Sequence, residues 1–200
     1  MGKKLVTIDE FKTYKNISNS ESDDIIEALI TRCSDFIKTY CGKTFIDYAA
    51  VAKTEYFDAV GTNVIHVDEY PIISVDSLTT STDSGKTYGT ALVEFDDFFI
   101  DTEVGSITSA YDAFVLPSAS AVAKGRSKKS FKITYKGGYL KLPTEIRQAC
   151  LDLIEYYRES EYTPRQSFEG FNVENLGFRA GSSVNLPSHI KRVLDMYREI

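Results

Sequence analysis

The stretch from Leu142 to Tyr162 constrains the fold more than any other part of the chain. Pro143 suits a first helical position, where a missing N–H costs nothing, and Glu145 suits the positive end of a helix dipole. Apolar side chains then recur with helical spacing, so that one face of a helix carries Ile146, Ala149, Cys150, Leu153, Ile154 and Tyr157. We therefore predict a helix over residues 143–162.

An amphipathic helix cannot bury its own apolar face, so this one needs a partner. The best partner is a predicted helix over residues 21–41, with Gly42 marking its end. The same spacing gives this helix a stripe made of Ile26, Leu29, Ile30, Cys33, Ile37 and Tyr40. A shorter helix over residues 7–15 is predicted from the capping box of Thr7 and Glu10. We expect the two long helices to form a common core.

The region 46–140 differs in composition, because it is rich in Val, Ile, Thr, Phe and Tyr and is interrupted by Gly, Asp and Ser. Runs typical of β-strands cover residues 54–60, 63–67, 72–80, 91–95, 98–101, 106–109 and 131–136. The predicted fold class is α+β: a helical core of N- and C-terminal amphipathic helices with a β-rich insertion between them. The thirteen Tyr and twelve Phe residues are expected to serve core packing and strands rather than a binding platform.

Beyond residue 162 the composition loosens, and Gly, Ser and Asn accompany scattered Phe. We interpret residues 1–162 as the core and residues 163–200 as an arm that ends in a helix. That helix carries an apolar stripe made of Leu186, Ile190, Val193, Leu194 and Tyr197. A helix of about four turns is marginal alone in water, so the stripe must dock on something. Its own core and a groove on another protein chain are both open, and the groove is preferred.

Length and charge limit the class of protein. With 200 residues the chain can bury one good core, or a core and a smaller lobe, and its 42% hydrophobic and 26% charged residues are ordinary for a globular protein. No apolar run approaches the roughly 20 residues that cross a bilayer, and the N-terminus lacks a signal-peptide core, so we expect a protein made and kept in a cytoplasm. The three cysteines are expected to stay reduced. A net charge of −6 argues against a protein that grips nucleic acid.

The sequence offers no convincing active site, cofactor site or metal site. His66 and His189 have no cysteine or carboxylate at ligand spacing, and no arrangement typical of nucleophilic catalysis stands out. Two runs of charged residues are candidates for a functional role. The acidic run consists of Glu94, Asp96, Asp97, Asp101 and Glu103, and the basic run of Lys124, Arg126, Lys128, Lys129 and Lys132.

Three interpretations of these runs stay open. They can be ordinary solvated surface, or they can meet, either within the chain or between neighbouring copies of it. The acidic run can instead serve a glycan-binding or glycan-hydrolysing module. That alternative predicts a monomer whose pocket brings Asp96, Asp97 or Asp101 close together.

The order of the predicted elements resembles a known family. A short capped helix is followed by IIEALITRCSDFIKTYCGKTF, then a β-rich insertion containing YPIISVDSL, then ITYKGGY leading into LPTEIRQACLDLIEYY. Tyr40–Lys43 matches a Tyr-Cys-Gly-Arg-like segment of that family, and Tyr135–Tyr139 with Pro143 matches its last strand and Pro-led helix. Over residues 5–162 the chain resembles the head–tail connector, or head-completion adaptor, proteins of tailed bacteriophages.

The resemblance implies a structural virion protein of the neck, without catalysis or cofactor, made in the host bacterial cytoplasm. Such adaptors assemble as a ring, expected to be twelvefold, beneath the portal protein, and they dock a stopper or tail-completion protein. DNA passes through the channel without specific binding, and no membrane is involved. The resemblance also implies that the C-terminal segment reaches the portal. From its apolar stripe we expect the terminal helix to dock on the portal or on a neighbouring subunit. A bacterial interaction domain unrelated to virions is a further alternative.

Overall fold

Helix α2 (Asp23–Cys41) is the longest helix in a computed structural model that describes residues 2–59, 62–81, 83–110, 127–159 and 186–198. Asp23 and Asp24 occupy its first turn, where the helix dipole favours negative charge. The helix ends at Gly42, which adopts a left-handed φ of 73° and donates its N–H to the Lys38 carbonyl. A residue with a Cβ would be strained in that conformation, so Gly42 sets the end of the helix.

The other described helices are α1 (Ile8–Lys15), α4 (Thr144–Tyr157) and α6 (Ser188–Tyr197). The capping box predicted for α1 is confirmed, because the Thr7 hydroxyl accepts the Glu10 N–H and the Glu10 carboxylate accepts the Thr7 N–H. The regular part of α4 ends at Tyr157, short of the predicted residue 162, and residues 160–162 lie outside the described part of the chain. None of the described helices is long and apolar enough to cross a membrane.

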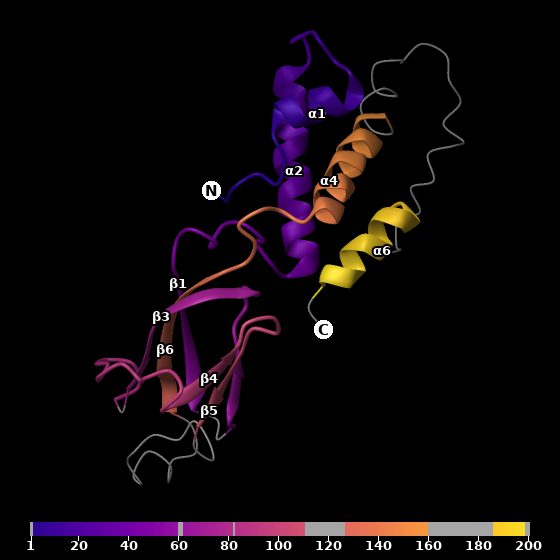
Figure 1. Ribbon diagram of the computed structural model, residues 1–200. Helices are drawn as coiled ribbons and strands as arrows, with labels where there is room; N and C mark the ends of the chain where they lie inside the picture. Colours follow the sequence, from indigo (N-terminus) through magenta and orange to yellow (C-terminus); the bar gives the residue numbers. More distant parts are fainter. Residues whose placement is uncertain (1, 60–61, 82, 111–126, 160–185, 199–200) are drawn as a thin grey trace. The chain divides into compact units, whose positions relative to one another are not determined.

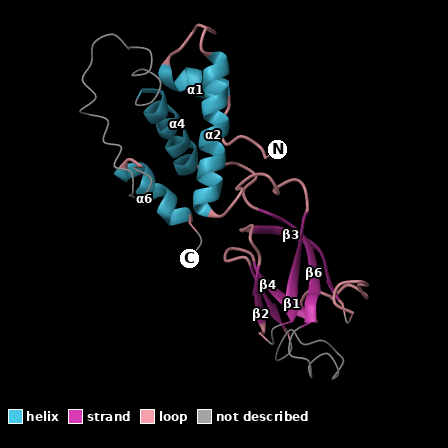
Figure 2. Cartoon of the chain, turned by 180° about the vertical axis from the view of Figure 1, so that it is seen from behind, coloured by secondary structure: helices cyan, strands magenta, loops and turns pink. Residues whose placement is uncertain are grey.

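Residues 1–42 and 142–200 form one compact unit, termed the helical unit. Figure 1 shows α2 and α4 side by side with α6 against them, and Figure 2 shows the same group from behind. The predicted packing of the two long helices is therefore confirmed. The buried apolar side chains are Ile26, Ile30, Cys33, Ile37 and Cys41 of α2 and Ile146, Ala149, Cys150, Leu151, Leu153 and Ile154 of α4. Three residues of the predicted stripes, Leu29, Tyr40 and Tyr157, are only half-buried.

Helix α1 contributes one buried ring to the fold and makes polar contacts with α4. Phe11 is fully buried, and burying a phenylalanine stabilises the fold by about 1.5–3 kcal/mol. The Tyr14 hydroxyl donates to the Asp152 carboxylate over 2.9 Å, and Lys15 pairs with Glu155 over 2.8 Å. Surface ion pairs contribute only about 0–1 kcal/mol each, so the burial of Phe11 stabilises the fold more than either of these polar contacts does.

Residues 43–141 form a second compact unit, termed the β unit, which contains two small antiparallel sheets (Figure 1). The first has the strand order β1-β6-β3 and consists of β1 (Lys53–Ala59), β6 (Ser127–Gly137) and β3 (Ile72–Thr80). The second has the order β2-β5-β4 and consists of β2 (Val64–His66), β5 (Ser106–Ser109) and β4 (Phe98–Asp101). Both sheets contribute to one apolar cluster, made of Ile65, Val67, Ile72, Leu78, Phe98, Ile107, Phe131, Ile133 and Tyr135. The α+β fold class is confirmed.

The predicted strand run at residues 91–95 is not a strand, whereas all the other predicted runs correspond to β1–β6. It follows β3 only at its start, where the Leu92 N–H donates to the Leu78 carbonyl over 2.7 Å. The Asp97 carboxylate then accepts the Val93 N–H over 2.8 Å and turns the chain. The aspartate offers the backbone a competing partner, which overrides the local β-propensity.

The paired glycines at the end of β6 are required by close approaches of the backbone. A Cβ on Gly137 would lie 2.2 Å from the Glu69 carbonyl oxygen, and one on Gly138 would lie 2.2 Å from the Phe45 carbonyl oxygen. Gly138 also has a φ of 93°, which strains any residue with a side chain. The Gly-Gly pair that contributed to the family resemblance is therefore a packing requirement of the β unit.

Replacing Leu153 by Ala should destabilise the helical unit by about 2–5 kcal/mol, because the side chain is fully buried in α4 and its removal leaves a cavity. Denaturant unfolding followed by circular dichroism measures the change. Leu140→Ala is the matched control, because Leu140 is 77% exposed and its truncation should cost less than about 0.5 kcal/mol. Equal stability of the two variants would contradict the helical core.

Candidate functional site

Helix α6 uses its apolar stripe within its own chain. Ile190 and Leu194 are 1% and 0% exposed, and α6 contacts both α2 and α4. The Tyr40 hydroxyl donates to the Asp195 carboxylate over 2.6 Å, and the Cys41 thiol donates to the Leu194 carbonyl over 3.6 Å. The remaining predicted docking residues, Leu186, Val193 and Tyr197, are half-buried. Two central members of the stripe are thus already covered by the helical unit.

Another face of α6 is exposed and carries cations. Met196 is 75% exposed, and Lys191 and Arg192 are exposed as well. A shallow hollow on this face is lined by Ser188, Lys191, Arg192, Asp195 and Met196. We term Lys191, Arg192 and Met196 the outer face of α6. Docking of this helix on a second protein stays a prediction, and the outer face is the part of α6 that is open to a partner.

The acidic run serves backbone turns. The Asp97 carboxylate accepts the Val93 N–H, and the Asp101 carboxylate accepts the N–H groups of Glu103 and Val104 over 3.1 and 3.2 Å. The other members of the run, Glu94, Asp96 and Glu103, are exposed. Among the described residues no group of three or more potential metal ligands occurs. These contacts give the glycan-handling interpretation no support, because the carboxylates cap turns or face solvent.

A turn within the acidic run holds phenylalanine rings in solvent. Phe95 has a φ of 72° and is 72% exposed, and its N–H donates to the Phe98 carbonyl over 2.8 Å. Phe99 is 47% exposed, and its ring stands edge-to-face with that of Phe95 at a centroid distance of 6.5 Å. A left-handed φ costs a bulky residue on the order of 1–3 kcal/mol, so the backbone presents Phe95 at a cost in stability. We term Val93, Phe95 and Phe99, with the exposed Glu94 and Asp96, the aromatic tip.

Only part of the basic run is described. Lys124 and Arg126 lie outside the described residues, whereas Lys128 and Lys129 are exposed near the start of β6. Lys129 has a φ of 50°, and its N–H donates to the Asp58 carboxylate over 2.8 Å. The structure therefore places the second half of the run at a defined position on the first sheet.

Two tyrosine rings accompany these lysines. The Lys129 ammonium lies 5.3 Å from the ring centroid of Tyr56, and the Lys132 ammonium lies 5.4 Å from that of Tyr88. The two ring centroids are 6.1 Å apart, and the Tyr88 hydroxyl donates to the Lys129 carbonyl over 3.0 Å. Cation–π contacts contribute about 0.5–1 kcal/mol at exposed sites and orient the cations. We term Tyr56, Tyr88, Lys128, Lys129 and Lys132 the lysine–tyrosine face.

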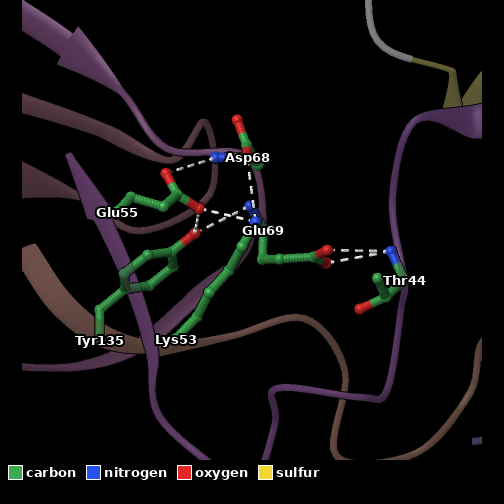
Figure 3. A network of polar contacts seen from close by, with 6 residues as sticks. All are labelled: Thr44, Lys53, Glu55, Asp68, Glu69 and Tyr135. Carbon is green, nitrogen blue, oxygen red and sulfur yellow. Dashed lines mark hydrogen bonds and ion pairs between the residues drawn. The ribbon is translucent and has the colours of Figure 1, made fainter. Parts of the chain in front are cut away.

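The buried polar groups of the β unit form a network around Tyr135, shown in Figure 3. The Tyr135 hydroxyl donates to the Glu55 carboxylate over 2.6 Å and accepts the Glu69 N–H over 3.0 Å. Lys53 pairs with the carboxylates of Glu55 and Asp68 over 2.7 and 2.9 Å. Tyr135 is fully buried and also belongs to the apolar cluster, so one residue joins the polar and apolar parts of the core.

The Glu69 carboxyl points away from this group toward Thr44 in Figure 3. It accepts the Thr44 N–H over 3.0 and 3.2 Å and so holds the first residues of the β unit. Burial raises the pKa of Glu69, although the hydrogen bonds from Thr44 oppose that rise. Burial also raises the pKa of Tyr135, and its hydrogen bond to Glu55 adds to the rise. The phenol therefore stays a neutral donor at physiological pH, and the network acts in structure.

Tyr135→Phe should destabilise the β unit by about 1–3 kcal/mol, because the Glu55 carboxylate and the Glu69 N–H each lose a buried partner. Since folding raises the pKa of Tyr135, its stabilisation is complete below the ordinary value of 10.0 and is lost as the pH rises above it. The stability difference between wild type and variant should thus be constant below pH 10 and shrink above it.

Urea unfolding across the pH range measures this difference. Tyr56→Phe is the control, because that ring is 48% exposed, and it should unfold like the wild type. A difference that does not change with pH, or a variant as stable as the wild type, would show that the phenol proton does not hold the network.

Comparisons with known proteins cover nearly the whole chain. The family model described as "Head completion protein" matches residues 4–200. A chain from the solved neck of an empty GTA particle, computed with C6 symmetry, has a similar fold with a TM-score of 0.59. It is 12% identical, and the match covers 98% of this chain and 90% of that one, which shows a common fold. No curated protein matches the chain.

The family model extends over both units and the terminal helix, beyond the residues 5–162 that carried the resemblance. The resemblance to head–tail connector proteins of tailed bacteriophages is confirmed, and with it the assignment as a structural protein of the virion. The chain belongs to the head completion protein family.

Proposed function

We propose that the chain is one subunit of a closed ring in the virion neck, between the portal protein and the next neck or tail component. The observation that carries this proposal is the family match over residues 4–200. The likeness to a chain from a neck with C6 symmetry, over 98% of this chain, supports it. The ring is proposed to be twelvefold, which is compatible with a sixfold axis because twelve is a multiple of six.

The ring extends the channel through which DNA leaves the head. The net charge of −6 suits that role, because an acidic wall does not bind the phosphate backbone. Any side chain that faces the channel is repeated in every subunit, so a modest charge on one chain becomes a strong field in the ring.

Contact with the portal protein is assigned to the outer face of α6. The exposed Met196 offers a flexible apolar group, and Lys191 and Arg192 flank it with positive charge. The partner surface is proposed to be an apolar groove of the portal with acidic groups at its rim. The apolar stripe of α6 serves a different purpose, since Ile190 and Leu194 fasten the helix to its own unit. Deleting residues 185–200 should therefore destabilise the helical unit, and point substitutions on the outer face make the better test.

Met196→Asp combined with Lys191→Glu should weaken binding to the purified portal protein by roughly tenfold or more, about 1.4 kcal/mol, and leave thermal unfolding unchanged. Biolayer interferometry measures the affinity, and native mass spectrometry counts the bound subunits. Leu140→Asp combined with Lys141→Glu is the matched control, because it makes the same charge changes at an exposed apolar residue and an exposed lysine of the β unit. Undiminished portal binding by the α6 variant would exclude its outer face as the docking surface.

Contacts between neighbouring subunits are assigned to the two charge runs. Glu94, Asp96, Asp97, Asp101 and Glu103 of one copy are proposed to face Lys124, Arg126, Lys128 and Lys129 of the next. Exposed charge pairs contribute only about 0–1 kcal/mol each and act mainly on the rate and register of association. The charge runs are therefore expected to guide assembly rather than to supply most of its affinity.

Lys128→Glu combined with Lys129→Glu should reduce assembly, and salt should reduce the assembly of the wild type, because both changes weaken attraction between opposite charges. Native mass spectrometry and sedimentation velocity at increasing salt measure the fraction of assembled subunits. Lys86→Glu combined with Lys141→Glu is the control with the same change in net charge at other exposed positions. Assembly that is indifferent to both salt and charge reversal would mean that the runs are ordinary solvated surface.

A further inference from the structure

The aromatic tip is built as a rigid, exposed contact surface. Phe95 is 72% exposed, Val93 55% and Phe99 47%, so a large apolar area meets water in one short segment. The backbone of this segment is fixed, since the Phe95 N–H bonds to Phe98 and the Ala110 N–H donates to the Asp97 carbonyl over 2.9 Å. A surface that is already ordered loses little entropy on binding, and exposed aromatic anchors dominate the energetics of interfaces.

The charges beside the rings indicate what kind of partner fits. Glu94 and Asp96 are exposed on either side of Phe95, and neither forms an ion pair with a residue that the structure describes. A partner for this tip should combine aromatic or apolar surface with positive charge. An acidic or purely apolar partner would leave both carboxylates desolvated without compensation.

The lysine–tyrosine face has that combination. Tyr56 is 48% exposed, the Lys129 ammonium lies over its ring, and the preceding residue, Lys128, is exposed. The contact of Lys129 with Tyr56 and the contact of Lys132 with Tyr88 hold two cations over two rings. Phenylalanine rings can pack against tyrosine rings and lysine methylene groups, while the carboxylates of the tip reach the ammonium groups.

We infer that the aromatic tip of one subunit binds the lysine–tyrosine face of a second copy of this chain. The two surfaces are different, so the contact is head to tail, and a head-to-tail contact that closes on itself forms a ring. The inference rests on the ring of the proposed function and deepens it, because it adds an aromatic anchor, Phe95, to the charge pairs. DNA is the competing ligand for a surface of lysines and tyrosines, but the net charge of −6 and the complementary tip on the same chain favour a second copy.

A cross-linking experiment on the full chain tests this contact. The native cysteines Cys33, Cys41 and Cys150 are buried, so one exposed cysteine can be introduced at a time. Phe95→Cys and Lys128→Cys are mixed in equal amounts and treated with a bismaleimide reagent, and the linked peptides are identified by mass spectrometry. The mixture should give a several-fold higher yield of linked dimer than either variant alone. Leu140→Cys mixed with Lys128→Cys is the control for random collisions, because Leu140 is exposed but lies outside the tip.

A charge exchange supplies an independent readout. The double variant Glu94→Lys with Asp96→Lys should reduce assembly. The double variant Lys128→Glu with Lys129→Glu should reduce it as well. A chain that carries all four changes should assemble again, because the opposite charges are restored with their positions exchanged. Phe95→Ser should reduce assembly by roughly tenfold or more, whereas Phe95→Tyr should retain it.

The outcomes separate the inference from the proposed function. If rings form on the portal but Phe95→Cys is not linked preferentially to Lys128→Cys, the proposed contact is wrong and the ring of the proposed function is unaffected. The same conclusion follows if rings form but the exchanged charges do not restore assembly. Equal linkage within Phe95→Cys alone also overturns the proposed contact, because the contact would then be symmetric. The lysine–tyrosine face is assigned to DNA instead if two results coincide. The variant with Lys128→Glu and Lys129→Glu loses affinity for duplex DNA, and the yield of linked dimer stays at the level of the control. Absence of any ring with the portal overturns the proposed function itself.

Discussion

The apolar contact between α2 and α4 is the interaction on which the helical unit depends. More than one hundred residues separate the end of α2 at Cys41 from the start of α4 at Thr144. The entropy cost of closing such a loop rises only slowly with its length, whereas each fully buried isoleucine or leucine stabilises the fold by about 1.5–3 kcal/mol. A whole β unit can therefore be inserted between two helices that pack together, and the chain still closes one helical core.

The β unit depends on its central strand, β6, which bonds to β1 on one side and to β3 on the other. Tyr135 of this strand places its ring in the apolar cluster and its hydroxyl between Glu55 and the Glu69 N–H. Buried carboxylates are tolerable only when their oxygens are satisfied, and both oxygens of Glu55 accept hydrogen bonds. The result is a rigid scaffold that can hold a strained, exposed turn.

That rigidity links the fold to the proposed assembly. A subunit of a ring needs two unlike surfaces at a constant separation, one for each neighbour. The aromatic tip and the lysine–tyrosine face both belong to the β unit, so the same core fixes both. Phe95 adopts a strained φ although its side chain faces solvent and adds nothing to the core. A binding partner for the exposed ring would explain why the chain tolerates this strain. The outer face of α6 belongs to the helical unit and is available for a different partner.

Local chemistry was sufficient for the parts of the structure that depend on near neighbours in sequence. Helical spacing identified α2, α4 and α6, the capping box identified the start of α1, and Gly42 marked a helix end, because each signal acts within a few residues. Most strands followed from β-rich runs between turn residues. The motifs that carried the family resemblance are also local, because they are helix ends, turns and close backbone approaches. The family could therefore be recognised from short stretches of sequence.

Only the tertiary structure determines which side chains bury which apolar faces and which side chains stay exposed. Periodicity shows that α6 has an apolar face, but it contains no information on whether that face meets its own chain, and only the folded structure places Ile190 and Leu194 on α2 and α4. The exposure of Phe95 follows from a turn whose Asp97 carboxylate competes with the sheet for the Val93 N–H. The partners of Tyr135 come from strands and loops far away in sequence. Contacts of this kind depend on the sum of many weak interactions across the whole core, so no short pattern of residues can encode them.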